Sequence, residues 1–238
     1  MLKESFELIH KIRFPLFALI SLWMVKIVEV VSGVRLYFLG IYPREWSGLP
    51  GIFTSPFIHS SWGHLASNSM PLLVLMAIMV IFYKKVFANS IISIMLGEGI
   101  MVWLFARPSY HIGASGVVYG LIAFVFWTGI FKKNAKSVVL SLIVLTLYAG
   151  SVESVFPDAG KNISWESHLF GALVGLVVAF IFKNVIEEDE KQYHNSPWIN
   201  DETEKRYFLP RDVFEKTKTE RYYETLIKDE SQDDLIEN

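Results

Sequence analysis

The sequence contains six apolar stretches, each close to the length that a helix needs to cross a lipid bilayer. A bilayer core takes about 20 apolar residues of α-helix, and lipid favours helices because it cannot satisfy exposed backbone groups. The predicted spans are Phe14–Val34, Leu65–Tyr83, Val86–Phe105, Gly113–Phe131, Ser137–Val152 and Ser164–Phe182. The sequence therefore predicts an all-α membrane protein, a bundle of six transmembrane helices.

Charge divides the chain into an apolar basic body and an acidic tail. Residues 184–238 hold 16 of the 24 acidic residues but only 8 of the 22 basic ones, so the formal net charge of −2 describes neither part. This pattern is typical of a membrane protein, and no nucleic-acid partner is expected. Cysteine is absent, which excludes a disulfide framework, a thiolate metal site and a cysteine nucleophile.

The basic residues of the connecting segments predict the orientation of the bundle. Nine of them lie on the side of the N-terminus and four on the other side, and Lys and Arg gather on the cytoplasmic side of a membrane. Both termini are therefore expected in the cytoplasm (N-in/C-in). We expect a cytoplasmic N-terminus at residues 1–13, a six-helix domain at 14–183 and an acidic, largely flexible cytoplasmic tail at 184–238. The expected location is the plasma (inner) membrane of a prokaryote.

Two other features of the body have a predicted structural role. The connection Arg35–Gly63 is long and rich in Trp, Tyr, Pro and Gly, and a loop of this length is usually functional or partly embedded in the membrane. Lys26 and Glu29 lie three residues apart in the first span, where an internal ion pair would make two charges tolerable. Glu98 in the third span is predicted to be a packed or hydrogen-bonded carboxyl rather than a catalytic acid.

The polar, reactive residues of the body gather at one end of alternate spans. The second, fourth and sixth spans run in the same direction, so their N-terminal ends share one side of the membrane. His64 and Asn68 open the second span, four residues apart on one helical face. Ser115 and Tyr119 open the fourth span with the same spacing, and His168 opens the sixth. Strongly polar side chains inside spans indicate functional sites by default.

Glycines explain how the fourth and sixth spans could meet. Each span carries two glycines four residues apart, Gly116 and Gly120 in the fourth and Gly171 and Gly175 in the sixth. Such small faces allow two helix backbones to approach closely in lipid. Close packing would bring a serine hydroxyl within reach of an imidazole, the contact that activates a serine nucleophile.

Hydrolysis by an activated serine also needs hydrogen-bond donors for the negatively charged oxygen (the oxyanion) that forms in the transition state. The side chains of His64 and Asn68 are candidates, and the N–H of Ser115 at a helix start adds a favourable dipole. The ring of Tyr119, one turn after Ser115, could support the imidazole. Each of these motifs alone is weak, because small residues and structural histidines are common in spans. Their coincidence at one membrane depth is much stronger.

At these residues the sequence resembles the rhomboid family of intramembrane serine proteases, over about residues 14–183. The family signatures are His-x4-His-x3-Asn, Gly-x-Ser-Gly and His-x2-Gly-x3-Gly. They read here as His59, His64 and Asn68; Gly113, Ser115 and Gly116; and His168, Gly171 and Gly175.

The resemblance implies a catalytic dyad of Ser115 and His168 with no aspartate, metal or cofactor. It implies an oxyanion site formed by His64, Asn68 and the Ser115 amide, and a Tyr119 ring that packs on the imidazole. The expected partners are the lipid bilayer and transmembrane protein substrates with a locally unstable helix and small residues near the cut.

Two alternatives remain open. A non-proteolytic protein with the same scaffold could bind or extract transmembrane clients, and it would tolerate loss of Ser115 and His168. A small transporter would need a continuous polar path across the membrane. The inner halves of the second, fourth and sixth spans are apolar, which disfavours the transporter.

Overall fold

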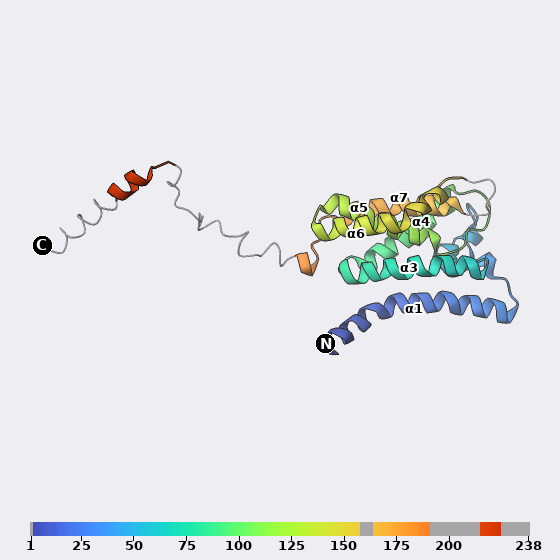
Figure 1. Cartoon of the computed structure of the whole chain (residues 1–238). Coiled ribbons are helices and arrows are strands. Elements are labelled where there is room, and N and C mark those ends of the chain that lie inside the picture. The colour runs from blue at the N-terminus through green and yellow to red at the C-terminus, as the bar shows by residue number, and fades with distance from the viewer. Residues whose placement is uncertain (1, 158–163, 191–214, 225–238) are drawn as a thin grey trace. The chain divides into compact units, whose positions relative to one another are not determined.

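The computed structural model describes residues 2–157, 164–190 and 215–224, with side chains from residue 12 onward. The chain divides into two compact units, residues 1–187 and 188–238. Within the described residues, six helices of the first unit are long and apolar enough to cross a membrane (Figure 1). This confirms the predicted all-α, multi-pass membrane bundle. The predicted flexibility of the tail concerns mainly residues 191–214 and 225–238, which lie outside the described residues.

The observed helices follow the predicted spans closely. Their bounds are α1 Leu2–Ser32, α3 Trp62–Phe82, α4 Phe87–Phe105, α5 Ser115–Lys132, α6 Ala135–Tyr148 and α7 Trp165–Phe182. The fifth span is completed by the 3₁₀ helix η4, Ala149–Val155, which continues α6. Helix α1 starts well before its apolar part, which begins at Ile12. It ends before Gly33, whose φ of 69° is the left-handed conformation that commonly terminates a helix.

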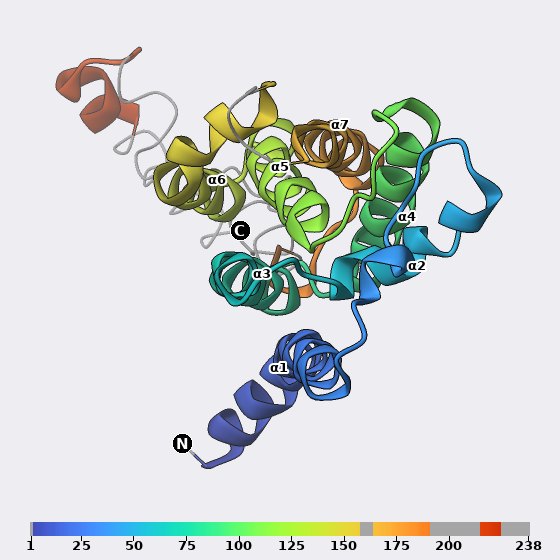
Figure 2. The ribbon, with the colours of Figure 1, turned by 90° about the vertical axis from the view of Figure 1, so that its right-hand side faces the viewer.

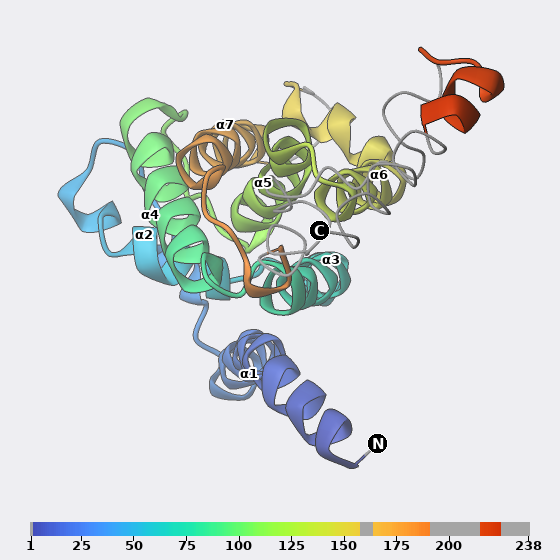
Figure 3. The same cartoon turned by 90° about the vertical axis from the view of Figure 1, so that its left-hand side faces the viewer.

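Helix α5 is the central element of the first unit. Viewed along the bundle, α3, α4, α6 and α7 surround it (Figure 2), and it is the most buried of the six spans. Its most extensive packing is against α7. Helix α1 lies outside this group and packs against α3, as both end-on views show (Figures 2 and 3). The Trp23 indole of α1 donates a 3.0 Å hydrogen bond to the Ser69 hydroxyl of α3.

The backbones of α5 and α7 approach each other through their glycines. A β-carbon on Gly171 would lie 2.1 Å from the carbonyl oxygen of Gly116. One turn further along, a β-carbon on Gly175 would lie 2.1 Å from the carbonyl oxygen of Gly120. No larger residue fits at these crossings without moving a helix, so the glycines fix the distance between α5 and α7.

The first loop contains η1 Leu36–Leu39, η2 Trp46–Gly48, α2 Gly51–Thr54 and η3 Ser55–Phe57. It docks on the end of α4, where the Arg44 guanidinium donates to the carbonyls of Leu104 (3.3 Å) and Ala106 (2.8 Å). An isolated antiparallel bridge pairs Ile41 with His111. The loop is therefore fixed beside the segment that leads into α5.

Candidate functional site

Ser115 is the first residue of α5 and follows a tight turn. Gly113 has a φ of 111°, which an L-residue rarely adopts. Its N–H donates to the Ser55 carbonyl at 2.9 Å, which ties the turn to η3. The first N–H groups of a helix have no partner within that helix. The amide of Ser115 thus belongs to the group of donors at the positive end of the α5 dipole.

His64 and Asn68 of α3 face this turn. A β-carbon on Gly113 would lie 2.8 Å from His64 Nε2 and 3.6 Å from Asn68 Nδ2. The first distance is a clash and the second an ordinary contact, so the glycine leaves room for the His64 ring beside the start of α5. The His64 imidazole and the Asn68 carboxamide thus lie next to Gly113, two residues before Ser115. An oxyanion at this position could accept hydrogen bonds from several donors.

His168 of α7 is held by two contacts. Its ring stacks on the ring of Tyr119 of α5, with centroids 4.2 Å apart and planes 11° from parallel. Its Nδ1 lies 2.9 Å from the Ser154 carbonyl oxygen of η4, and the Tyr119 hydroxyl donates to the neighbouring Ser151 carbonyl at 2.7 Å. A carbonyl can only accept, so Nδ1 carries the proton. In the neutral ring Nε2 is then the proton acceptor.

One cavity of about 880 Å³ brings these residues together. Its lining includes His64, Asn68, Ser115, Tyr119 and His168. Within the described residues no hydrogen bond joins the Ser115 hydroxyl to the His168 imidazole. A hydrogen bond of this kind often tightens only in the complex with substrate.

Sequence reasoning missed the main-chain acceptors of η4 and the contacts of His111 in the same cavity. The Ser164 hydroxyl lies 2.5 Å from Nδ1 of His111, and Nε2 of that imidazole lies 3.0 Å from the Arg107 carbonyl. Arg107 also forms an ion pair with Glu166 of α7 at 3.3 Å. Main-chain carbonyls have no signature in a sequence, and these side chains stand outside the three recognised motifs.

His59 contacts the turn at Gly113 and Ala114 that precedes α5. The side chain is 1% exposed, and its Nε2 accepts a long hydrogen bond (3.5 Å) from the Ala114 N–H. Burial, with a smaller contribution from the neighbouring His64, lowers the pKa of His59 to about 4. The His59 ring is therefore neutral near pH 7. Its Nε2 can accept from the Ala114 N–H only in this form, because both nitrogens of a protonated imidazole are donors.

Replacing His59 with glutamine is expected to make the protein less sensitive to acid. The unfolded chain takes up a proton at this site near pH 6.5, whereas the folded protein takes it up near pH 4. The neutral histidine therefore contributes fully to the free energy of unfolding above pH 6.5. This contribution, about 3 kcal/mol, is lost as the pH falls from 6.5 to about 4. Thermal unfolding in detergent micelles at a series of pH values measures it. Equal pH dependence in the wild type and the glutamine variant would contradict the expectation.

Comparison with known proteins agrees with the geometry. The family model "Rhomboid domain" matches residues 44–185. "Uncharacterized protein Rv1337" of Mycobacterium tuberculosis is 36% identical over 170 residues, which cover 67% of this chain and 70% of that protein. "Putative rhomboid protease YdcA" of Bacillus subtilis is 26% identical over 170 residues, or 69% of this chain and 78% of that protein. The protein with this six-span bundle therefore belongs to the rhomboid family.

Proposed function

We propose that this rhomboid-family protein is an intramembrane serine endopeptidase in which Ser115 is the nucleophile and His168 the general base. One observation carries the proposal. Both side chains line one cavity, on two helices whose backbones meet at the glycine crossings, and Nδ1 of His168 is occupied by the Ser154 carbonyl. The remaining ring nitrogen is thus the one available to take a proton from a serine.

The chemistry follows from this arrangement. The Ser115 oxygen bonds to the scissile carbonyl carbon while its proton passes to Nε2 of His168. The same nitrogen then gives the proton to the leaving amine as the C–N bond breaks. The resulting ester of Ser115 is hydrolysed by water that His168 deprotonates in turn. The Tyr119 ring and the Ser154 carbonyl keep the imidazole in one orientation through both steps.

The donors around Gly113 would stabilise the oxyanion. The Ser115 N–H belongs to α5, and the side chains of His64 and Asn68 reach its start from α3. Losing one oxyanion donor typically costs about 3–4 kcal/mol of transition-state stabilisation. The cavity is also lined by hydroxyls, among them Ser60, Ser67 and Ser109. Polar walls of this kind suit the water that deacylation consumes.

The proposed substrates are transmembrane segments of other membrane proteins. The cavity is lined by residues at the N-terminal ends of α3, α5 and α7, three helices long and apolar enough to cross a membrane. In an intact helix the scissile carbonyl is committed to a backbone hydrogen bond, so a locally unstable segment is easier to present. The proposed location is a prokaryotic plasma membrane.

Labelling with a fluorophosphonate tests the assignment of the nucleophile. An activated serine attacks phosphorus, an O–P bond forms and fluoride leaves. We expect the purified protein in detergent micelles to be labelled at one residue, Ser115, identified by mass spectrometry of its peptides. The Ser164→Ala variant is the matched control, because it removes a serine hydroxyl of the same cavity that lies 2.5 Å from a histidine ring nitrogen, and it should be labelled at the wild-type rate. Absence of labelling in folded wild-type protein, or a label on Ser164, would overturn the proposal. The first of these outcomes would favour a non-proteolytic role in binding transmembrane clients.

A further inference from the structure

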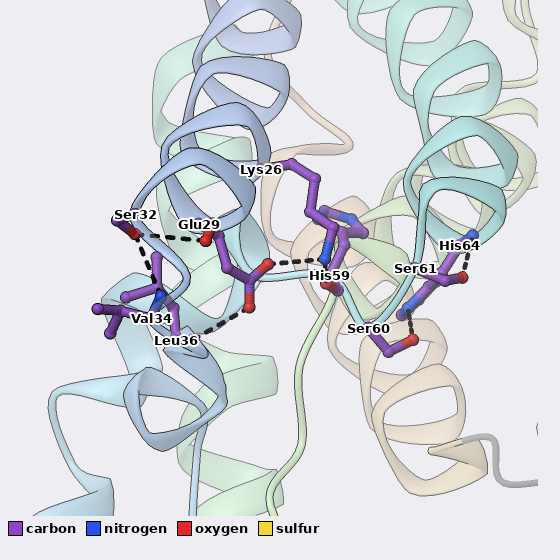
Figure 4. Close-up of polar contacts among 9 residues, drawn as sticks. All are labelled: Lys26, Glu29, Ser32, Val34, Leu36, His59, Ser60, Ser61 and His64. Atoms are coloured by element: carbon purple, nitrogen blue, oxygen red, sulfur yellow. Dashed lines mark hydrogen bonds and ion pairs between the residues drawn. The ribbon is translucent and has the colours of Figure 1, made fainter.

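The ion pair of α1 makes a contact that its structural role does not require. Lys26 is only 7% exposed. Its ammonium lies 2.7 Å from Glu29 Oε2 and also donates to the carbonyl oxygen of His59 at 2.9 Å (Figure 4). The second oxygen of Glu29 accepts from the Leu36 N–H at 3.0 Å. The carboxylate is thus held from two directions, and the ammonium it holds points away from α1 toward the segment that precedes α3.

That segment, residues 59–61, holds His64 by three contacts. The His59 ring meets the His64 ring edge-on, with centroids 5.0 Å apart. The Ser60 hydroxyl lies 3.2 Å from Nδ1 of His64, and the Ser61 hydroxyl caps α3 by accepting from the His64 N–H at 3.1 Å (Figure 4). The same segment reaches the start of α5, because the His59 ring accepts from the Ala114 N–H. Residues 59–61 thus position an oxyanion donor and the backbone beside the nucleophile.

We propose that Lys26 is a positioning residue for the oxyanion site: its ammonium, oriented by Glu29, fixes the His59 carbonyl and so sets the places of His64 and of the Ala114–Ser115 backbone. The proposal rests on the proposed function of Ser115 and extends it to a helix outside the family match, which begins at residue 44. Helix α1 lies at the edge of the bundle, against α3 (Figure 2). The Lys26–Glu29 ion pair therefore connects this outer helix to the proposed oxyanion site through the His59 carbonyl.

The test must separate positioning from simple stabilisation. Lys26→Met alone leaves the partly buried Glu29 carboxylate without its ion-pair partner, which destabilises a protein whatever the role of the pair. The informative variant is the double substitution Lys26→Met with Glu29→Gln, which removes both charges and the bond to His59 together. Arg13→Met is the matched control, because it removes an exposed basic side chain from the same helix.

We expect the double variant to fold, to keep the KM for a transmembrane reporter in proteoliposomes, and to lose kcat by about 10- to 100-fold, the scale for a misplaced catalytic group. Its rate of fluorophosphonate labelling should fall to a similar extent, with Ser115 still the labelled residue. Arg13→Met should match the wild type in both measurements. A double variant that is stable and retains wild-type kcat and labelling rate would overturn the proposal. Absence of labelling in the wild type would instead be a failure of the proposed function.

Discussion

Replacing Ser115 with alanine is expected to lower the cleavage of a transmembrane reporter by at least about 10⁴-fold, the scale seen when a serine nucleophile is removed. The loss should be chemical rather than structural. The residue that caps α5 is Ala114, so the serine hydroxyl is not needed to start the helix. Thermal unfolding in detergent micelles should therefore be unchanged in the variant, and a turnover assay in proteoliposomes measures the rate.

The partner variant His168→Gln tests whether the two residues act as one unit. Removing the base should lower the rate by a similar factor, because an unactivated serine is a weak nucleophile. When two groups act together, removing both costs little more than removing either one. The double variant should therefore show the rate of Ser115→Ala alone. Rates that fall multiplicatively would mean that the two side chains contribute independently, and cleavage that persists in Ser115→Ala would remove that residue from the mechanism.

The six spans could be predicted from the sequence because one physical requirement controls them. Lipid demands both apolar side chains and internally satisfied backbone groups, so hydropathy located α3 to α7 within a few residues. The same requirement does not set the start of α1. Residues 2–11 lie outside the apolar stretch yet continue the helix, since a helix outside the lipid depends on local propensity rather than on hydropathy.

The sequence could predict the side chains of the candidate site but not its main-chain groups. The sequence identified Ser115, His168 and Tyr119, and the cavity includes all three. It could not identify the carbonyls of Ser151 and Ser154, because every residue has a carbonyl and only the fold selects one. The bond from Lys26 to the His59 carbonyl is of the same kind. The spacing of Lys26 and Glu29 predicts their ion pair, which the distance of 2.7 Å between the two groups confirms, but nothing in the sequence indicates the His59 carbonyl as a third partner.

The glycine crossing of α5 and α7 sets the remaining prediction. Replacing Gly171 with alanine is expected to lower both the thermal stability and the rate of labelling at Ser115, the latter by about 100-fold. The new β-carbon would lie 2.1 Å from the Gly116 carbonyl oxygen, far inside contact distance, and a backbone atom of a buried helix cannot rotate away as a side chain would. Overpacking of this kind typically costs about 1–3 kcal/mol.

The crossing lies close to both proposed catalytic residues, which is why a single methyl group should affect the chemistry. Gly116 follows Ser115 directly, and Gly171 lies three residues after His168 on the adjoining turn of α7. Separating the helices there must lengthen the path from the hydroxyl to the imidazole. Gly150→Ala is the matched control, because a β-carbon at that position in η4 would meet nothing within 4 Å, and it should retain wild-type unfolding and labelling. A Gly171→Ala protein with native stability and a native labelling rate would show that α5 and α7 can separate without disturbing Ser115 and His168. The close approach at the glycines would then not be required for the proposed mechanism.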